Sequence, residues 1–319
     1  AFFSQLVAGP IERARNLLPN ITEPRRITMD KIGRGAVLSL VGLIKKVVIA
    51  DGLAPSVDAV FAAEAPSGAD VALAVVFFAI QIYCDFSGYT DIARGTARML
   101  GFDLMRNFSQ PYFAGNPQEF WRRWHISLST WLRDYLYVSL GGNRKGRRRT
   151  YVNLMATMAL GGLWHGAAWN FVLWGVYHGT LLVVHRALAG RPAAQPPARP
   201  AIVSALRRVG AAAVFFPVVC YGWLLFRAES LEQIVQMTGA LLTLSPAQFA
   251  TATVPEPPFA TLLGIAALLA WDLSLEISGR PQVYRGLPVV LRGGLYATMV
   301  YLLAFGATST PSSFIYFQF

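Results

Sequence analysis

Two blocks of sequence, FWRRWHISLSTWLRDY at residues 120–135 and GGLWHGAAWN at residues 161–170, decide how this chain folds and what it can do. Each block centres on a histidine, His125 in the first and His165 in the second, with tryptophan on either side in sequence. A glycine-rich cationic loop, GGNRKGRRR at residues 141–149, joins them. The rest of the chain is largely apolar, so we interpret it as a scaffold for the two histidines.

The composition places this chain in a membrane. Of its 319 residues, 54% are hydrophobic and only 14% are charged, whereas a soluble domain carries about 25% charged residues. The apolar runs are too long for barrel strands, and a lipid environment requires every backbone polar group to be paired within the segment. We therefore predict an all-α polytopic membrane protein.

The net charge of +11 is carried mainly by loops at the ends of apolar segments. This placement is typical of the positive-inside rule and of contact with anionic lipid headgroups. We expect membrane lipid as a partner and no nucleic acid. The two cysteines, Cys84 and Cys220, both lie in apolar runs, so they indicate neither a disulfide framework nor a metal site.

Hydrophobic periodicity predicts apolar helices at seven places, residues 35–54, 69–83, 151–164, 169–188, 209–226, 259–277 and 287–305. Residues 119–140 have helical periodicity but are too charged to cross lipid alone, so we expect one helix there, either at the membrane interface or inside the bundle. The Pro- and Ala-rich residues 190–208 indicate a loop or linker.

Charged and polar residues interrupt two of these predicted spans. Lys45 and Lys46 lie inside the first, where they either face a cavity or a partner or extend to the membrane interface. The second leads into a polar patch from Asp85 to Asp91. The helix either continues through this patch or ends at Gly88.

The residues around the histidines allow acyl-transfer chemistry. A neutral imidazole in an apolar site, such as that of His165, can take a proton from a hydroxyl group as it attacks an acyl carbon. The alternative is a structural histidine that is hydrogen-bonded to a neighbouring helix. Beside His125, Arg122 and Arg123 can bind phosphate or carboxylate, or else anchor an interfacial aromatic belt.

Other functional motifs are absent from the sequence. It contains no dinucleotide-binding GxGxxG, no Walker loop, no HExxH and no GxSxG. His178 and His185 are seven residues apart on one predicted helix, but no acidic residue lies near them in sequence. We therefore predict no metal site.

At its two histidine blocks the sequence resembles the membrane-bound O-acyltransferase (MBOAT) family, and within it the bacterial alginate O-acetylation branch. The similar stretches are FFSQLVAGPI at residues 2–11, QIYCDFSGYTDIARG at 81–95, residues 107–142, residues 153–179 and the terminal FIYFQF. They extend from one end of the chain to the other. The match is loose over residues 190–260.

The resemblance implies a fold and a site. It implies a helix bundle with a central tunnel, in which residues 1–319 form one membrane-embedded domain and correspond to the C-terminal part of a longer protein. The family's catalytic histidine falls on His165, and its second histidine falls on His125. Our candidate substrate-binding residues are Arg122, Arg123, Trp124, Asp85, Trp164 and Asn170.

The implied function is O-acetylation of an exported polysaccharide, either alginate-like or a cell-wall glycan, at the bacterial inner membrane. The expected donor is acetyl-CoA or another acyl thioester, with no tightly bound cofactor. A periplasmic acetylase or polysaccharide-export proteins are the expected partners.

Two alternatives stay open at this point. One is D-alanyl transfer to teichoic acid by the same fold. The other is a transporter component without chemistry, in which Lys45, Lys46, Asp85 and Asp91 line a path.

Overall fold

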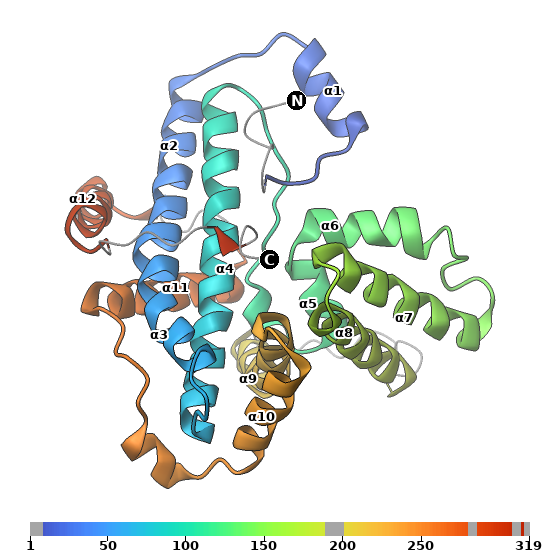
Figure 1. Cartoon of the computed structure of the whole chain (residues 1–319). Coiled ribbons are helices and arrows are strands. Elements are labelled where there is room, and N and C mark those ends of the chain that lie inside the picture. Colours follow the sequence, from blue (N-terminus) through green and yellow to red (C-terminus); the bar gives the residue numbers. More distant parts are fainter. Residues whose placement is uncertain (1–8, 189–200, 280–285, 308–313, 316–319) are drawn as a thin grey trace. The chain divides into compact units, whose positions relative to one another are not determined.

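The computed structural model describes residues 9–188, 201–279, 286–307 and 314–315, and all regular elements in these ranges are helical. Figure 1 labels the elements. The described residues form two compact units. Unit 1 draws on residues 1–64, 76–107 and 252–318, and unit 2 on residues 65–75 and 108–251.

The helices of unit 1 come from both ends of the chain. In order they are α1 (Ala14–Thr22), α2 (Met29–Leu43), the π-helical segment η2 (Ile44–Ala50), α3 (Asp51–Phe61), most of α4 (Gly68–Met99), α11 (Phe259–Ser278) and α12 (Val289–Phe305).

The helices of unit 2 come from the middle of the chain. In order they are the short turn η3 (Pro111–Phe113), α5 (Pro117–Arg123), α6 (Ile126–Trp131), the π-helical segment η4 (Leu132–Tyr137), α7 (Gly146–His165), α8 (Trp169–Leu188), α9 (Ala201–Arg227), α10 (Leu231–Leu242) and η5 (Pro246–Thr251).

Glycines set the distance between α2 and α4, which run side by side in Figure 1. A Cβ atom at Gly42 would lie 2.5 Å from the Gly88 carbonyl oxygen, and one at Gly35 would lie 2.5 Å from the Gly95 carbonyl oxygen. Both helices repeat the contact after seven residues, which is two helical turns. Gly88 therefore does not end the helix, because α4 continues through it and uses it for close packing.

Buried ion pairs account for the lysines of the first predicted span. Lys45 Nζ lies 2.8 Å from a carboxylate oxygen of Asp91, and Lys46 Nζ lies 2.8 Å from oxygens of both Asp51 and Asp85. The side chains of Asp51 and Asp85 are only 3% exposed. Both lysines are thus paired inside unit 1. Removing one member of such a pair leaves a buried charge uncompensated, at a cost of about 3–5 kcal/mol.

The C-terminal segments close unit 1 around α4. The backbone N–H of Ile315 donates to Asp85 at 2.7 Å, and the hydroxyl of Tyr83 donates to Asp272 at 2.9 Å. On α11, Thr261 donates to the Val48 carbonyl at 2.9 Å. Residues more than 180 positions apart in sequence therefore satisfy one another's buried polar groups.

The predicted class, an all-α polytopic membrane protein, is confirmed. Among the described residues four helices are long and apolar enough to cross a membrane: α4, α8, α11 and residues 205–227 of α9. This is fewer than the seven predicted apolar helices. Residues 35–54 instead extend from α2 through η2 into α3, and α12 is apolar but only 17 residues long.

Two boundaries differ from those predicted. Of the predicted linker 190–208, residues 190–200 lie outside the described residues, and residues 201–208 are helical within α9. The cationic loop is shorter than expected because α7 begins at Gly146, so the last three arginines of the GGNRKGRRR stretch belong to its first turn.

We expect alanine substitutions at two glycines of α2 to change stability in opposite directions. Gly42→Ala would force α2 away from the Gly88 carbonyl, and we expect it to cost about 1–3 kcal/mol of unfolding free energy. Gly33→Ala is the matched control, since no atom lies within 4 Å of its added Cβ. It should stabilise the protein by up to about 1 kcal/mol through helix propensity. Thermal unfolding of detergent-purified protein measures both changes, and equal effects would contradict close packing at Gly42.

Candidate functional site

A break in the backbone positions His125. The sequence predicts a single helix over residues 119–140, and this prediction is wrong, because α5 ends at Arg123 and α6 begins at Ile126. Asn116 caps the start of α5 by accepting a hydrogen bond from the Glu119 amide. At the break His125 adopts a left-handed conformation with φ 40° and ψ 57°.

The left-handed turn places the aromatic residues of the 120–135 block in two different environments. Phe120 and Trp124, before the turn, are buried and stack with ring centroids 5.7 Å apart. Trp131 and Tyr135, after it, are 40% and 55% exposed. His125 itself is 4% exposed. Left-handed backbone costs a residue that carries a Cβ roughly 1–2 kcal/mol, and such strain concentrates at functional sites.

His165 lies at the C-terminal end of α7, inside a group of aromatic rings. The ring centroids of Trp174 and Phe226 are each 5.1 Å from that of His165, with interplanar angles of 85° and 83°. Phe171 lies 6.3 Å away. Edge-on packing of this kind is favourable between rings, and His165 as a whole is half-buried.

Close packing of α7 against α8 brings these rings to His165. A side chain at Gly162 would overlap the Phe171 carbonyl, and one at Gly175 would overlap the Met158 carbonyl. The glycines therefore allow backbone-to-backbone contact, as in tightly packed membrane helices. Figure 1 shows α7 and α8 running alongside each other.

The two histidines are close enough to influence each other. Trp164 lies beside both, with its ring 5.0 Å from that of His165 and 6.4 Å from that of His125. Burial lowers the pKa of His125 to about 3, and repulsion from His165 contributes to this shift. Burial also lowers the pKa of His165 to about 4. Both imidazoles are therefore neutral at neutral pH, and each can accept a proton.

The other two histidines differ in environment. His178 is 1% exposed and stacks on Phe120, with centroids 5.9 Å apart and an interplanar angle of 6°. His185, two turns further along α8, lines a surface pocket. The described residues contain no group of three or more His, Cys, Asp or Glu side chains placed to hold a metal ion.

The candidate substrate-binding residues lie in different environments. Arg122 lines the same pocket as His185, whereas Arg123 is bound to Glu119 and to the Gln110 carbonyl. Trp124 is 2% exposed and packs between aromatic rings. Asn170 donates to the Ala228 carbonyl at 2.9 Å and to the Phe226 carbonyl at 3.4 Å, so it holds the end of α9.

Asp85 belongs to unit 1, where its carboxylate accepts hydrogen bonds from Lys46 and from the Ile315 amide. The remaining candidates all belong to unit 2. The structure therefore brings His125, His165 and Trp164 together. It gives Asp85 and Asn170 polar partners within their own units.

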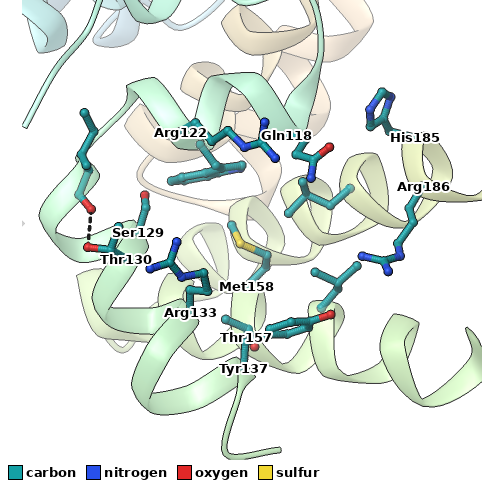
Figure 2. Close-up of a pocket in the computed structure, with 14 residues that line it drawn as sticks. Gln118, Arg122, Ser129, Thr130, Arg133, Tyr137, Thr157, Met158, His185 and Arg186 are labelled. Carbon is teal, nitrogen blue, oxygen red and sulfur yellow. Dashed lines mark hydrogen bonds between the residues drawn. The ribbon is translucent and has the colours of Figure 1, made fainter. Parts of the chain in front are cut away.

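A pocket of about 930 Å³ lies between α5, α6 and η4 on one side and α7 and α8 on the other. Figure 2 shows Arg122 and Gln118 along its upper side, Arg133 at the left and Arg186 extending inward from the right. The sequence interpretation named only Arg122 among these residues. Arg133 and Arg186 were missed because they are 53 residues apart and only the packing of η4 near α8 brings them to one pocket.

Two aromatic neighbours of His165 were also missed. Trp174 lies four residues before His178 on α8, so helical spacing could have linked these two side chains. Phe226 carried no local signal, because it comes from α9, which is distant in sequence.

Comparison with known proteins shows similarity to one family. Residues 1–221 match the model of a family described as MBOAT, membrane-bound O-acyltransferase family. The chain is 45% identical over 286 residues to a "Probable alginate O-acetylase AlgI" of Azotobacter vinelandii, covering 89% of this chain and 54% of that protein.

Two further relatives are less similar to this chain. The chain is 37% identical over 248 residues to a "Peptidoglycan O-acetyltransferase" of Helicobacter pylori, covering 77% of this chain and 46% of that protein. It is 26% identical over 204 residues to a "Teichoic acid D-alanyltransferase" of Streptococcus thermophilus, covering 58% and 48%. The chain spans about half the length of the curated relatives it matches.

We expect Asn170→Ala to destabilise the protein rather than to change its affinity for a substrate. The substitution leaves the buried Phe226 and Ala228 carbonyls without their side-chain donor, at a cost of about 1–3 kcal/mol. Thr180→Ala, at an exposed position of the same helix, is the matched control, with an expected effect within about 0.5 kcal/mol. Thermal unfolding compares the two, and an unchanged midpoint for Asn170→Ala would argue against this anchoring role.

Proposed function

Because this chain belongs to the membrane-bound O-acyltransferase family, we propose that it serves as an integral-membrane O-acyltransferase that supplies acetyl groups for O-acetylation of an exported polysaccharide. The observation that carries the proposal is the pair of neutral imidazoles, His165 and His125, whose rings both lie beside that of Trp164 in a site built of aromatic rings. Such a site supplies a base for acyl transfer.

In the proposed reaction His165 is the general base. Its neutral ring takes the proton from an acceptor hydroxyl as the oxygen attacks the carbonyl carbon of an acyl thioester. A C–O ester bond forms, the C–S bond breaks, and the departing thiolate recovers the proton from the imidazolium. His165 could instead carry the acyl group itself as a relay residue.

We assign His125 a positioning role for the donor or the acceptor. Its left-handed backbone fixes the ring at the start of α6 and its burial keeps it neutral, so it can donate one hydrogen bond and accept another. Trp164, which is 53% exposed, offers a surface beside both histidines for a substrate to pack on.

The proposed donor is acetyl-CoA or another acyl thioester that binds transiently and not as a resident cofactor. Support comes from the cationic character of unit 2, in which Arg122 and the arginines at the start of α7 are exposed. The polysaccharide acceptor lies outside the cytoplasmic membrane, so we place the protein as a multi-pass component of the bacterial inner membrane. A periplasmic acetylase or polysaccharide-export proteins would complete the transfer.

Two observations rank the alternatives lower. Matches to D-alanyltransferases are weaker, at 26% identity over 204 residues and 32% over 116 residues, against 45% over 286 residues for the alginate relative. A transport path along Lys45, Lys46, Asp85 and Asp91 is disfavoured because these four side chains neutralise one another within buried ion pairs.

The test of catalysis is His165→Ala in the whole protein, expressed in its native background. We expect the acetyl ester content of the exported polysaccharide to fall by at least a hundredfold, since general-base catalysis contributes about 10²–10⁴-fold. Leu160→Ala, at an exposed position of the same helix, is the matched control, and immunoblotting of membranes checks abundance. Normal acetylation at normal abundance would remove His165 from the mechanism.

The lowered pKa of His165 predicts an unusual pH profile. Protonation inactivates a general base, and burial moves the pKa of this base from its ordinary value to about 4. We therefore expect the initial rate of acyl transfer by purified protein to stay level between about pH 7 and about pH 5 and to decline only towards about pH 4. A half-maximal rate near the ordinary histidine pKa of about 6.5 would show that the working base is solvated.

A further inference from the structure

Three arginines line the pocket of unit 2, and no carboxylate is among its lining residues. Its volume is about 930 Å³, and its lining includes Arg122, Arg133, Arg186 and His185 but neither Asp nor Glu. The pocket is therefore a positively charged concavity of the size that holds a drug-sized ligand.

Two of the three arginines have no counter-charge in the part of the chain that the structure describes. Arg133 pairs with its neighbour Asp134 at 2.7 Å, whereas no salt bridge or hydrogen bond forms at Arg122 or at Arg186 among the described residues. Guanidinium groups stay protonated at any physiological pH and present a planar fork that matches phosphate oxygens. The pocket thus carries at least two positive charges available to an anion.

Two further hydrogen-bond donors around the pocket lack an acceptor in the described part of the chain. The indole N–H of Trp121 and the hydroxyl of Tyr137 have no partner among the described residues. By contrast, the hydroxyls of Ser129, Thr130 and Thr157 already donate to backbone carbonyls. A ligand that satisfies this pocket must be rich in acceptor oxygens, as a phosphate is.

Apolar side chains cover the rest of the pocket. Ile126, Leu154, Met158 and Leu182 contribute to its wall, and Figure 2 shows Met158 between the arginines of the two sides. A free inorganic anion would not bury this surface. The lining matches an amphiphile that joins a phosphate to a chain of low polarity.

Trp121 connects the pocket with the histidine site. Its ring is edge-on to Trp174 at a centroid distance of 5.6 Å, and Trp174 is edge-on to His165 at 5.1 Å. Two ring contacts therefore lead from the pocket wall to the proposed base. The pocket wall and the proposed base are thus in contact through a single intervening ring, that of Trp174.

We propose that this pocket binds the phosphate group of a chain-bearing amphiphile, with Arg122 and Arg186 as its principal phosphate ligands and Trp121 and Tyr137 as additional donors. Two sources share this chemistry, the phosphopantetheine arm of an acyl thioester and the headgroup of an anionic phospholipid. The first source rests on the proposed function, and the second does not.

The test measures ligand binding to purified protein in detergent or nanodiscs. The variants are Arg122→Gln, Arg186→Gln and their combination, with Arg144→Gln in the cationic loop outside the pocket as the matched control. Tyr137→Phe removes one hydroxyl without changing charge. Size-exclusion elution and thermal unfolding check that each variant is folded.

The first arm uses coenzyme A as the probe and pantetheine, which lacks phosphate, as its comparison. We expect each Arg→Gln substitution to weaken coenzyme A binding about tenfold or more, Tyr137→Phe to weaken it severalfold, and Arg144→Gln to change it little. Pantetheine should bind weakly to every variant and should not distinguish them. This result identifies the thioester donor as the source of the phosphate.

The second arm counts phosphatidylglycerol molecules retained by the protein by native mass spectrometry, with phosphatidylcholine as the comparison. Loss of one retained phosphatidylglycerol in the double variant, with coenzyme A binding unchanged, would support the phosphate site with a lipid headgroup as its occupant. If neither probe distinguishes the pocket variants from Arg144→Gln, the proposal is overturned.

The experiments distinguish a failure of the phosphate-site proposal from a failure of the proposed function. His165→Ala should abolish acetyl transfer and leave coenzyme A binding unchanged, because His165 does not line the pocket. If His165→Ala transferred acetyl groups normally while the arginine variants bound coenzyme A more weakly, the pocket would still be identified as a phosphate site. Only the catalytic role of His165 would then be rejected.

Discussion

The close approach of α7 and α8 is the constraint on which the functional part of this structure depends. Gly162 and Gly175 each lie where a side chain would overlap a carbonyl of the facing helix. Only at this separation can Trp174 and Phe171, both on α8, reach the ring of His165 at the end of α7. The enclosure that lowers the pKa of His165 therefore follows from backbone packing, and the histidine alone would not produce it.

The two units differ in whether their functional or buried polar side chains have partners of opposite charge. In unit 1 the buried carboxylates of Asp51 and Asp85 both contact Lys46, so these charges are neutralised and hold η2, α3 and α4 together. In unit 2 the imidazoles of His125 and His165 are neutral, and the cations of the pocket face no carboxylate in its lining. Neutralised charges are typical of a scaffold, whereas unbalanced donors are typical of a surface that binds a ligand.

The helix break at His125 positions both the histidine site and the pocket residues. If residues 119–140 formed one helix, the ring of His125 and the side chains of Ser129 and Arg133 would lie along a single straight rod. The left-handed residue instead ends α5 and starts α6, which buries His125 while Ser129 and Arg133 line the pocket. One strained residue thus divides a continuous sequence motif between the histidine site and the proposed phosphate site.

The sequence by itself determined the helical membrane class, most apolar helices and the two histidine blocks, because hydrophobic periodicity and motif spacing are local properties. It also showed two lysines in an apolar stretch, but it could not choose between pairing and snorkelling. Tertiary structure decided this question by supplying Asp91 to Lys45 and both Asp51 and Asp85 to Lys46. It likewise decided the break at His125, the contact of Phe226 with His165 and the meeting of Arg122 with Arg186. Each of these features depends on which distant helices pack together. The spacing of neighbouring residues in the sequence does not predict such long-range contacts.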